Sequence, residues 1–543
     1  MASRKYGVVY TPNRLAQFVA ELLLDEMHLD KMQIESILDP ACGECALLNA
    51  IEKLAGNAIQ YYGIDVDKDV LNGNYENKKI IINDSILPKN VRQNTEIYWR
   101  KRVNRIQAII ANPPWSSEKI YDRELLRKAG FSLINGQYDS YVLFIELAYK
   151  LLDEGGYFAF ILPDSLFDSQ NISLREFLVK NTEIKVIARL GEKIFEEVNR
   201  ATTVIVCKKT VPSCDSKTKC FRLSTEERKQ YLGGEKNLMQ SYFEGMHVVS
   251  QNRFANNEAF IFDIDTKENE EKLIEKIKKN SIKWQEHFIF GRGVEISKTG
   301  KIVFCQACGC AQGYKKKQLQ SGKKICSLCG KEISITENVI ESVVSKYKTT
   351  NSVQICVGED VNRYRVNHSS YIKKDIPGIN YKNMTLYQPP KILVRKTGLG
   401  IYAAVDYSGG MTSQTVYILK QKTKINIPLE YYLAMLNSRV VYYYYLKVYG
   451  ENEWKSHPYL TKQIIFSLPI SKYDGGMLDQ EIITIARSLM VAYDYQLDIQ
   501  LENKIFQKYQ LSKEEIELIA EEINKLPDLS AINNMKFEVS DNV

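Results

Sequence analysis

Residues 36–54 read SILDPACGECALLNAIEKL, an apolar run that ends in an acid, a turn of small residues and then a helical pattern. A β-rich run followed directly by such a turn and a helix is typical of the first unit of a parallel sheet. The backbone of the turn, DPACGEC at 39–45, can approach a ligand closely because its side chains are small. We therefore expect an α/β fold with a ligand site at the end of this strand.

The same alternation continues on both sides of this stretch. Helical patterns cover about residues 13–27 and the run YDSYVLFIELAYKLL at 138–152. The β-rich runs are YYGIDVD at 61–67, IIINDSIL at 80–87, AIIANPPW at 108–115 and GGYFAFILPDSLF at 155–167. Strands that alternate with helices predict a parallel, doubly wound sheet, which we expect to occupy residues 1–212.

Asp65 ends the strand that follows the small-residue turn, about twenty residues after it. An acid at this place can accept hydrogen bonds from a ribose diol. Dinucleotide sites share this spacing, but they need the pattern GxGxxG, which is absent here. Cys42 and Cys45 also form a CxxC pair, which is typical of a redox site. A redox pair would require neither Asp65 nor the prolines further along the chain.

The segment IIANPPW, residues 109–115, places a carboxamide, two prolines and an indole directly after an apolar run. A strand that leaves its sheet through a rigid turn accounts for the prolines, because proline cannot donate a ladder hydrogen bond. It does not account for Asn112 at a strand end, where open α/β sheets bind ligands, or for Trp115 nearby. We therefore expect this segment to take part in binding or catalysis.

Several motifs occur in a fixed order: GVVYTP, DPACG, YGID, NDSIL, ANPPW and YDSYVLFIELAYKLLDEGG, followed by FILPDSLF and LGEKIFEEVNRATTVIV. This set resembles the gamma-class, or Taq-type, N6-adenine DNA methyltransferases over about residues 6–208. The resemblance implies a Rossmann-like domain that binds S-adenosylmethionine, with cofactor-binding positions at Tyr10, Thr11, Asp39, Ala41, Gly43, Asp65, Asp84 and Phe144. In the family pattern Asp84 also lies near the target base. The loop departs from the pattern at Cys45, where the family usually has glycine.

The chemistry of an exocyclic amine explains the catalytic tetrad Asn112, Pro113, Pro114 and Trp115. The N6 of adenine is a poor nucleophile because its lone pair is delocalised into the ring. Acceptors on the Asn112 side chain and the Pro113 carbonyl can hold its N–H groups so that the lone pair becomes available. Trp115 would stack on a base rotated out of the duplex, a contact worth about 1–3 kcal/mol. Phe195 matches the family's second stacking aromatic, with packing in the core as the alternative.

Beyond residue 212 the alternation of strands and helices ends, and the strongest local pattern is a pair of CxxC motifs. Seventeen residues separate the pair Cys305 and Cys308 from the pair Cys326 and Cys329. Four thiolates at this spacing can bind Zn²⁺ tetrahedrally, which predicts a structural zinc ribbon at about residues 300–335. Cys310 is a further thiol beside the first pair, so the choice of ligands stays open.

Positive charge is concentrated around the expected ribbon. The formal net charge of the chain is +7, and residues 291–350 alone contain 11 Lys or Arg against 4 Glu. A basic segment on an otherwise neutral chain favours a polyanionic partner, with a solvated lysine surface as the alternative. Together with the resemblance, this predicts double-stranded DNA as the partner and DNA-binding lysines at Lys315, Lys316, Lys317, Lys323 and Lys324.

The remaining chain resembles the target-recognition region and C-terminal helices of methyltransferases from restriction or phage-defence systems. We expect an α+β target-recognition region at residues 213–472 and a helical segment at residues 473–543. The tyrosines at 442–445 are expected to pack within a helix rather than stack on bases. No nuclease pattern of the PD…ExK kind stands out, so we expect no DNA cleavage by this chain and allow for restriction or phage-defence partner subunits.

Composition sets the remaining expectations. A chain of 543 residues that is 44% hydrophobic and 26% charged suits two or three globular domains. Neither a signal peptide nor a membrane span stands out in the sequence, so we expect a cytoplasmic protein without membrane contact. In such a protein, 11 cysteines favour bound metal or reduced thiols over disulfides. Two other functions stay open. One is methylation of RNA or of a protein glutamine amide, whose planar NH₂ poses the same problem, and the other is a non-catalytic DNA-recognition subunit.

Overall fold

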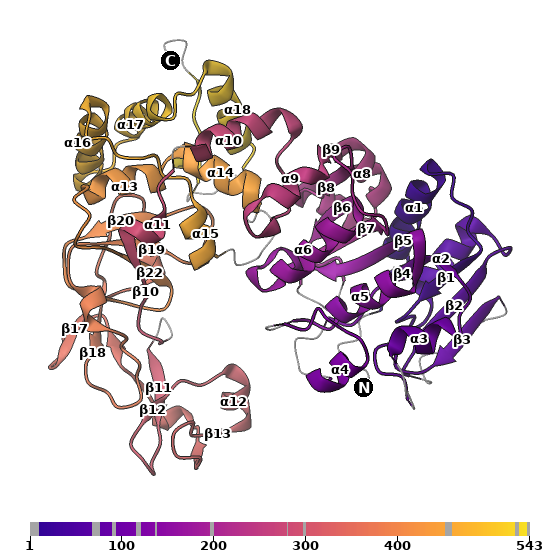
Figure 1. Cartoon of the computed structure of the whole chain (residues 1–543). Helices are drawn as coiled ribbons and strands as arrows, with labels where there is room; N and C mark the ends of the chain where they lie inside the picture. Colours follow the sequence, from indigo (N-terminus) through magenta and orange to yellow (C-terminus); the bar gives the residue numbers. More distant parts are fainter. Residues whose placement is uncertain are drawn as a thin grey trace. The chain divides into compact units, whose positions relative to one another are not determined.

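The structure of the chain is a computed structural model that describes residues 10–67, 77–89, 94–115, 121–135, 138–195, 200–279, 281–296, 300–450, 459–526 and 532–539. Residues 7–9 of the motif GVVYTP and residues 196–199 of the motif that follows Phe195 lie outside them. The chain forms two compact units (Figure 1). The first consists of residues 1–269 and 447–455, and the second of residues 270–446 and 456–543.

A nine-stranded sheet forms the centre of the first unit, in the order β3-β2-β1-β4-β5-β7-β6-β8-β9. Neighbouring strands from β3 to β5 run parallel, whereas β7 is antiparallel to both β5 and β6. The strands are β1 (Ser36–Asp39), β2 (Gln60–Asp65), β3 (Lys78–Ile82), β4 (Ile106–Ala111), β5 (Leu152–Pro163), β6 (Glu183–Gly191), β7 (Thr202–Lys208), β8 (Lys217–Arg222) and β9 (His247–Ser250). The winding direction reverses between β1 and β4, and a doubly wound sheet binds ligands at the carboxyl ends of such strands.

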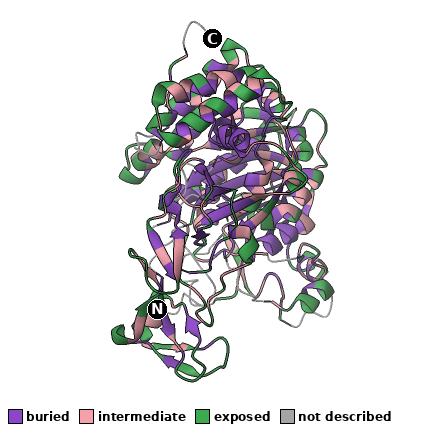
Figure 2. Ribbon diagram, turned by 90° about the vertical axis from the view of Figure 1, so that its left-hand side faces the viewer, coloured by how far each residue is buried: buried purple, intermediate pink, exposed green. Residues whose placement is uncertain are grey.

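Helices cover both faces of this sheet, so the predicted doubly wound arrangement is present. One face shares its hydrophobic core with α1 (Asn13–Leu29), α2 (Ala46–Ala55), α7 (Thr225–Gly233) and α8 (Leu238–Gly245). The other face shares its core with α3 (Thr95–Arg100), α5 (Tyr141–Leu151), α6 (Ile172–Asn181) and α9 (Gln251–Asn256). Strands β1 and β4 are buried along their whole length. Figure 2 shows buried residues in purple on strands in the interior and exposed residues in green on the outer sides of helices. Burial on both faces explains why Ile37 and Leu38 of β1 and residues 108–111 of β4 are apolar without alternation.

The first unit extends beyond residue 212, where the sequence predicted its end. β8 pairs in parallel with β6, and β9 pairs antiparallel with β8. Cys220 and Phe221 of β8 are fully buried, so this short, largely polar segment still contributes to the core. The unit therefore continues to Asn269.

Two four-stranded sheets form the larger part of the β structure in the second unit. One has the order β10-β22-β19-β20, from β10 (Phe288–Arg292), β19 (Lys391–Arg395), β20 (Ala403–Asp406) and β22 (Val416–Gln421). The other has the order β16-β18-β17-β21, from β16 (Val344–Ser345), β17 (Ser352–Cys356), β18 (Ser370–Lys373) and β21 (Met411–Thr412). Side chains of both sheets, including Ile355, Ile372, Leu393 and Ile418, share one hydrophobic core.

Helices complete the second unit, and the segment 473–543 is part of this unit rather than a unit of its own. Arg363 and Asp498 of α17 (Tyr495–Lys508) form a buried ion pair with an N–O distance of 2.9 Å, which ties the C-terminal helices to the β part. The tyrosines at 442–445 are buried in α14 (Arg439–Tyr449), which confirms that they pack in a helix. Within the described residues no helix is long and apolar enough to cross a membrane. The larger helices are α10 (Glu271–Lys279), α13 (Leu429–Leu436), α14 (Arg439–Tyr449), α16 (Met477–Val491), α17 (Tyr495–Lys508) and α18 (Lys513–Asn524).

Candidate functional site

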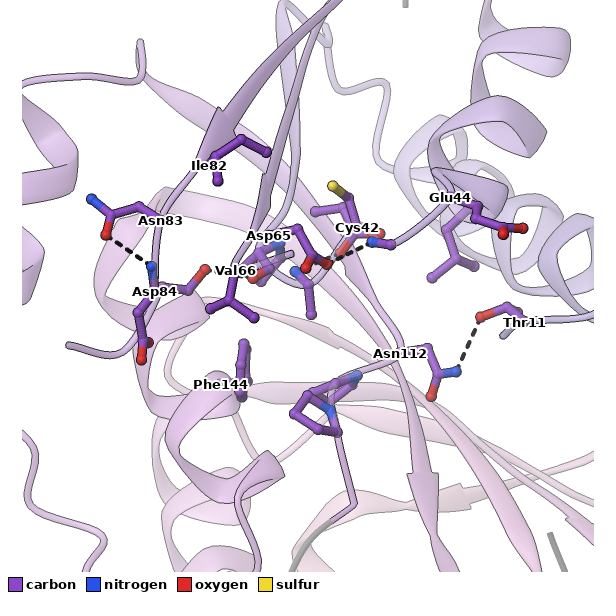
Figure 3. A pocket seen from close by; sticks show the side chains of 18 of the residues that line it. Thr11, Cys42, Glu44, Asp65, Val66, Ile82, Asn83, Asp84, Asn112 and Phe144 are labelled. Carbon is purple, nitrogen blue, oxygen red and sulfur yellow. Dashed lines mark hydrogen bonds between the residues drawn. The ribbon is translucent and has the colours of Figure 1, made fainter. Parts of the chain in front are cut away.

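A cavity of about 410 Å³ opens at the carboxyl ends of β1, β2, β3 and β4 in the first unit (Figure 3). All eight positions predicted to bind the cofactor line it, namely Tyr10, Thr11, Asp39, Ala41, Gly43, Asp65, Asp84 and Phe144. The tetrad Asn112, Pro113, Pro114 and Trp115 lines the same cavity. Two sets of residues that were predicted separately from the sequence therefore meet in one place.

The small-residue loop is held against the end of β2 by its own backbone. The amide of Gly43 donates to Asp65 Oδ2 at 2.8 Å, and the amide of Ala41 donates to Asp39 Oδ1 at 2.9 Å. Gly43 has a φ of +46°, and Cys45, the residue before α2, has a φ of +60°. The backbone at Cys45 is thus left-handed, a conformation that accounts for the glycine expected here from the resemblance.

The CxxC pair in this loop does not have the surroundings of a redox site. Cys42 and Cys45 are both buried, at 6% and 0% exposure. A hydrogen bond to Cys45 and burial raise the pKa of the Cys42 thiol above its ordinary value. Reactive redox cysteines are accessible and have lowered pKa values. The geometry therefore favours a structural role for this pair in the wall of the cavity.

Asp84 follows β3 and is held by hydrogen bonds from its own turn. Its Oδ1 accepts from the amides of Ile86 and Leu87 at 2.8 and 3.1 Å and from the hydroxyl of Tyr121 at 3.1 Å. Burial raises the pKa of Asp84, while these three donors act in the opposite direction. The carboxylate is therefore fixed at the edge of the cavity.

Asn112 is the first residue after β4, and a contact with the N-terminal segment orients its side chain. Its Nδ2 donates to Thr11 Oγ1 at 3.0 Å (Figure 3). With Nδ2 turned toward Thr11, the other end of the side chain is the carbonyl oxygen, which is a hydrogen-bond acceptor. The two prolines follow at once, and the hydroxyl of Ser140 donates to the Pro114 carbonyl.

Trp115 and Phe195 lie in direct contact. Their ring centroids are 5.4 Å apart and the ring planes are nearly perpendicular, at 89°. Both residues are buried in the same hydrophobic core, and the Trp115 indole donates to the carbonyl of Ile161 at 3.3 Å. In this arrangement no base fits between the two rings, and Phe195 does not line the cavity. The sandwich of a base between them remains a prediction that would require the rings to separate.

Asp39 carries the largest electrostatic perturbation among the acids of the cavity. Burial, together with the nearby carboxylate of Asp65, raises the pKa of Asp39 to about 8, although the Ala41 amide acts to lower it. The folded protein therefore holds a proton on Asp39 over a pH range in which an unfolded chain, with an ordinary pKa of 3.8, has released it.

Replacing Asp39 by asparagine should consequently stabilise the ligand-free protein in a pH-dependent way. Below about pH 4 both states bind the proton, so the variant and the wild type should have similar free energies of unfolding. As the pH rises toward 8 the wild type loses stability and the variant does not, and the difference should reach a few kcal/mol, on the order expected from this linkage. Denaturant titrations across this range measure it, with the exposed Asp25→Asn as control. If the free energies of unfolding of wild type and Asp39→Asn changed with pH in parallel, the raised pKa assigned to Asp39 would be wrong.

Sequence reasoning missed several residues that line the cavity. Val66 and Ile82 lie at the ends of β2 and β3, and both are unusually exposed apolar side chains, at 49% and 41%. Tyr121 contacts Asp84 but lies six positions after Trp115, outside every motif. The apolar residue directly after Asp65 was a usable signal, since a polar residue is expected where a strand leaves the sheet. No pattern in the sequence marked Tyr121.

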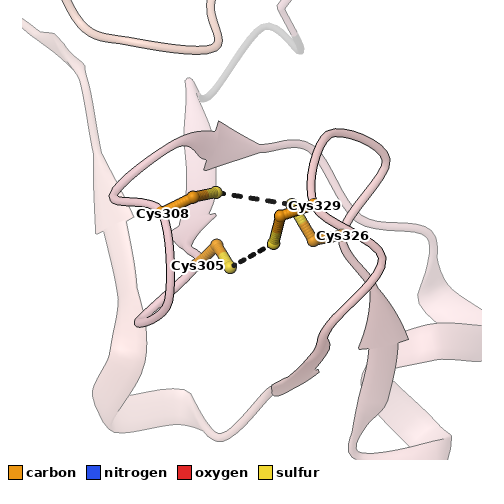
Figure 4. A group of neighbouring side chains, drawn as sticks. All are labelled: Cys305, Cys308, Cys326 and Cys329. Carbon is orange, nitrogen blue, oxygen red and sulfur yellow. Dashed lines mark hydrogen bonds between the residues drawn. The ribbon is translucent and has the colours of Figure 1, made fainter.

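The four cysteines predicted as zinc ligands form one cluster in the second unit (Figure 4). Their sulfur atoms all lie within 4.8 Å of one another, with Cys305–Cys329 at 3.6 Å and Cys308–Cys326 at 3.8 Å. A zinc tetrahedron with Zn–S distances of about 2.3 Å has sulfur–sulfur edges of about 3.8 Å. Cys310 is not part of the cluster; its carbonyl accepts from the Cys305 amide at 3.0 Å.

Each CxxC motif has the geometry of a turn around its first sulfur. The amides of Cys308 and Ala307 lower the pKa of Cys305, and those of Cys329 and Leu328 lower the pKa of Cys326 to about 6. The turns connect β11 (Lys301–Phe304) to β12 (Ala311–Gln312) and β13 (Lys323–Ile325) to β14 (Glu332–Ser334). Two hairpins that bring their turns together form a ribbon whose four thiols can bind one metal ion.

The five lysines predicted to bind DNA are not equivalent. Lys315, Lys316 and Lys317 are exposed at the start of the short helix α12 (Lys316–Ser321), between the two hairpins. Lys323 forms an ion pair with Glu332 at 3.1 Å, and Lys324 donates to the carbonyl of Gly313. The first three are therefore better placed than the last two to contact a polyanion.

Comparison with protein families identifies the chain. Residues 1–287, more than half of its length, match the N-6 DNA Methylase family. The chain belongs to the N-6 DNA methylase family. In this methylase, residues 353–470 also match the TaqI-like C-terminal specificity domain, and apart from residues 447–455 they belong to the second unit. Both matches confirm the resemblance to Taq-type N6-adenine methyltransferases that the ordered motifs predicted.

Individual relatives of this methylase are distant. It is 24% identical over 215 residues to the Type II methyltransferase M.AccI of Acinetobacter calcoaceticus, covering 38% of this chain and 37% of the relative. It is 22% identical over 237 residues to the Type I restriction enzyme MpnII methylase subunit of Mycoplasma pneumoniae, covering 38% and 41%. The chain thus spans about two fifths of the length of these relatives. The solved DrdV–DNA complex has the same fold, with a TM-score of 0.50 and 13% identity over 91% of this chain and 58% of that chain.

Proposed function

We propose that this methylase transfers a methyl group from S-adenosylmethionine to the exocyclic N6 of an adenine that is rotated out of duplex DNA at a specific site. The observation that carries the proposal is the shared cavity, which Asp39 and Asp65 line together with Asn112 and Trp115. A cofactor site and an amine-binding tetrad that open into the same space can hold a methyl donor next to an exocyclic amine.

The side chains of the cavity fit S-adenosylmethionine. Each oxygen of Asp65 accepts one backbone hydrogen bond, from Gly43 or Asp67, and a carboxylate oxygen has two lone pairs, so ribose hydroxyls can also be bound. The exposed apolar side chains of Val66 and Ile82 suit a flat adenine ring. Asp39 suits a cationic group, because a bound cation would offset the cost of ionising this buried carboxyl. When bound, this cofactor supplies an electrophilic methyl group.

The tetrad would prepare the target amine. The Asn112 side chain is oriented by its hydrogen bond to Thr11, and its oxygen can accept one N–H of the amine. The Pro113 carbonyl can accept the other N–H, and its direction is restricted by the proline rings. Two such acceptors withdraw the N–H bonds from the plane of the base and favour the tetrahedral nitrogen of the transition state. This interaction strengthens as charge develops on N6, so it lowers the barrier more than it strengthens binding.

The aromatic residues would stabilise the rotated base. Rotating a base out of the duplex costs a few kcal/mol, and stacking on one aromatic ring offsets about 1–3 kcal/mol of that cost. We assign the first stacking contact to Trp115, which lines the cavity. Phe195 would cover the other face of the base only after it moves away from its edge-on contact with Trp115.

The second unit would recognise the DNA sequence. The match of residues 353–470 to the TaqI-like specificity domain supports this role. We assign Cys305, Cys308, Cys326 and Cys329 to one structural Zn²⁺ ion, because the sulfur separations fit a zinc tetrahedron. Lys315, Lys316 and Lys317 on the same ribbon would then contact phosphates.

A place in a restriction or phage-defence system is also proposed, since the relatives include type I and type II restriction methylases. Methylation of RNA or of a protein glutamine amide is the second candidate, because the tetrad serves any planar NH₂. The match to a specificity domain favours DNA over both. The intact tetrad argues against a non-catalytic recognition subunit.

Incubation of the purified chain with tritium-labelled S-adenosylmethionine and unmodified duplex DNA tests the function. We expect the label to be recovered as N6-methyladenine after the DNA is digested to nucleosides. Labelling of RNA or of release-factor protein in parallel reactions, without labelling of DNA, would replace this function by the second candidate. Binding of DNA and cofactor without any transfer would identify a recognition subunit. Sequencing of modified bases in DNA from an expressing host then maps the recognised site.

A further inference from the structure

One face of the sheet β10-β22-β19-β20 carries cations that lie over aromatic rings. Directly paired residues of antiparallel strands point to the same face, and Tyr417 pairs with both Arg292 and Val394. Phe290 lies two positions before Arg292, and Lys396 lies two positions after Val394. Residues two positions apart in extended chain point to the same face, so both belong to this face as well. We call Arg292, Lys396 and Lys462, with the rings of Phe290, Tyr417, Tyr459 and Phe466, the basic–aromatic cluster.

Each lysine of the cluster lies between two rings. The Lys396 Nζ is 5.8 Å from the ring centre of Tyr417 and 5.9 Å from that of Tyr459. The Lys462 Nζ is 5.6 Å from the ring centre of Phe290 and 5.4 Å from that of Phe466. Cation–π contacts at such distances are worth about 0.5–1 kcal/mol at exposed sites. They hold the ammonium groups in place but do not neutralise them.

The cluster has no acidic counterpart in the part of the chain that the structure describes. No carboxylate there forms an ion pair with Arg292, Lys396 or Lys462. Burial lowers the pKa of Lys396, and the positive charge of Arg292 lowers it further. Like charges held close together without a partner cost free energy in the folded protein, which is typical of a site that binds an anion from outside.

The backbone that carries the cluster is fixed before any ligand binds. The amide of Lys396 donates to the carbonyl of Thr415 at 2.9 Å, and its own carbonyl accepts from the amide of Leu460 at 2.8 Å. Tyr417 donates from its hydroxyl to the carbonyl of Leu460 at 3.0 Å. The cluster therefore lies on β10, on β22, on the residue that follows β19, and on α15 (Lys462–Ser467) with the segment before it. Hydrogen bonds join the residue after β19 to the segment before α15, so the cluster needs no rearrangement to present its charges.

We propose that Arg292, Lys396 and Lys462 bind phosphates of the DNA backbone and position the duplex on the specificity domain. The proposal rests on the proposed function, because it takes duplex DNA as the substrate. The ligand is a phosphate rather than a base, since the lysines already cover the ring faces on which a base would stack. The cluster is a second set of phosphate contacts besides Lys315, Lys316 and Lys317.

The test compares two triple variants of the full chain that remove the same charge from the second unit. One is Arg292→Gln, Lys396→Gln and Lys462→Gln. The other is a control on the C-terminal helices, Lys504→Gln, Lys513→Gln and Lys525→Gln. Binding of a short fluorescent duplex of mixed sequence is measured over a range of salt concentrations. Thermal unfolding and zinc content show whether each variant is folded.

The cluster variant should bind the duplex more weakly than the wild type, by roughly tenfold or more near 0.1 M salt. Its plot of log affinity against log salt concentration should also have a shallower slope, by up to about 0.9 for each phosphate that the variant no longer neutralises. The control variant should bind like the wild type. If the cluster variant does not fold, the same binding measurements are made on Arg292→Gln alone. Arg292 is exposed and should neutralise about one phosphate, so its loss should lower the salt slope by up to about 0.9.

Equal affinity and equal salt slope for the cluster and control variants would overturn the proposal. This outcome leaves the function intact provided that the wild type still binds the duplex and labels its adenines. A wild type that neither binds nor labels duplex DNA would overturn the proposed function and, with it, this assignment. The two failures are therefore distinguishable in the same set of measurements.

Discussion

Replacing Asn112 by alanine is expected to lower the rate of methyl transfer roughly a hundredfold or more, as removal of one preorganised polar group at a developing charge does in other enzymes. The side chain is held by Thr11 at 3.0 Å, so its oxygen is in position before the substrate arrives. Its bond to the amine strengthens as N6 becomes tetrahedral and positive, so the effect should appear in the rate constant. Affinities for the cofactor and for DNA should change little.

Single-turnover methylation of duplex DNA from an unmodified host measures the rate, and calorimetry measures the affinities. Asn104→Ala is the matched control, because Asn104 is an exposed asparagine two residues before β4. Near-normal single-turnover methylation by Asn112→Ala would show that the tetrad does not act on the amine as proposed. A decrease confined to cofactor affinity would instead assign Asn112 to the cofactor site.

The catalytic half of the fold could be predicted because its signals are local. Each parallel strand is a short apolar run with a polar residue at its end, and the carboxyl ends of such strands meet at one edge of the sheet. Asp39, Asp65 and Asn112 could therefore be placed together from their positions alone. β8 could not be predicted in the same way, because the segment around Cys220 is largely polar and its pairing with β6 is a long-range contact.

The candidate site shows the same limit at the level of side chains. The position of Phe195 near Trp115 followed from a motif, but the perpendicular contact of the two rings depends on packing between segments 80 residues apart. The charge run predicted a basic ribbon, but it could not show that Lys323 is paired with Glu332 across the hairpin. Periodicity and spacing give the backbone position of a residue, whereas its partner depends on the folded neighbours.

The ribbon has a small hydrophobic core, so we expect its folding to depend on the proposed metal ion. Its buried cluster consists of Val303, Ile333 and Ile335 together with Cys305 and Cys326, so two of its five members are predicted ligands. A module this small usually depends on a metal or a disulfide for its stability. Bound zinc supplies about 10–16 kcal/mol of apparent free energy in isolated zinc-finger peptides, and most of this is folding free energy.

Replacing Cys326 by serine should therefore remove the zinc ion and unfold residues 300–335 while the nine-stranded sheet of the first unit remains folded. Elemental analysis should find about one zinc per wild-type chain and almost none in the variant, because serine is a poor zinc ligand. Hydrogen exchange should become fast in the ribbon only. Cys310→Ser is the matched control: it removes a neighbouring buried thiol that lies outside the cluster, and it should keep the metal. If Cys310→Ser lost its zinc, or if Cys326→Ser kept it, the four ligands would be assigned wrongly. If the wild-type protein contained no stoichiometric metal, the zinc ribbon would be excluded altogether.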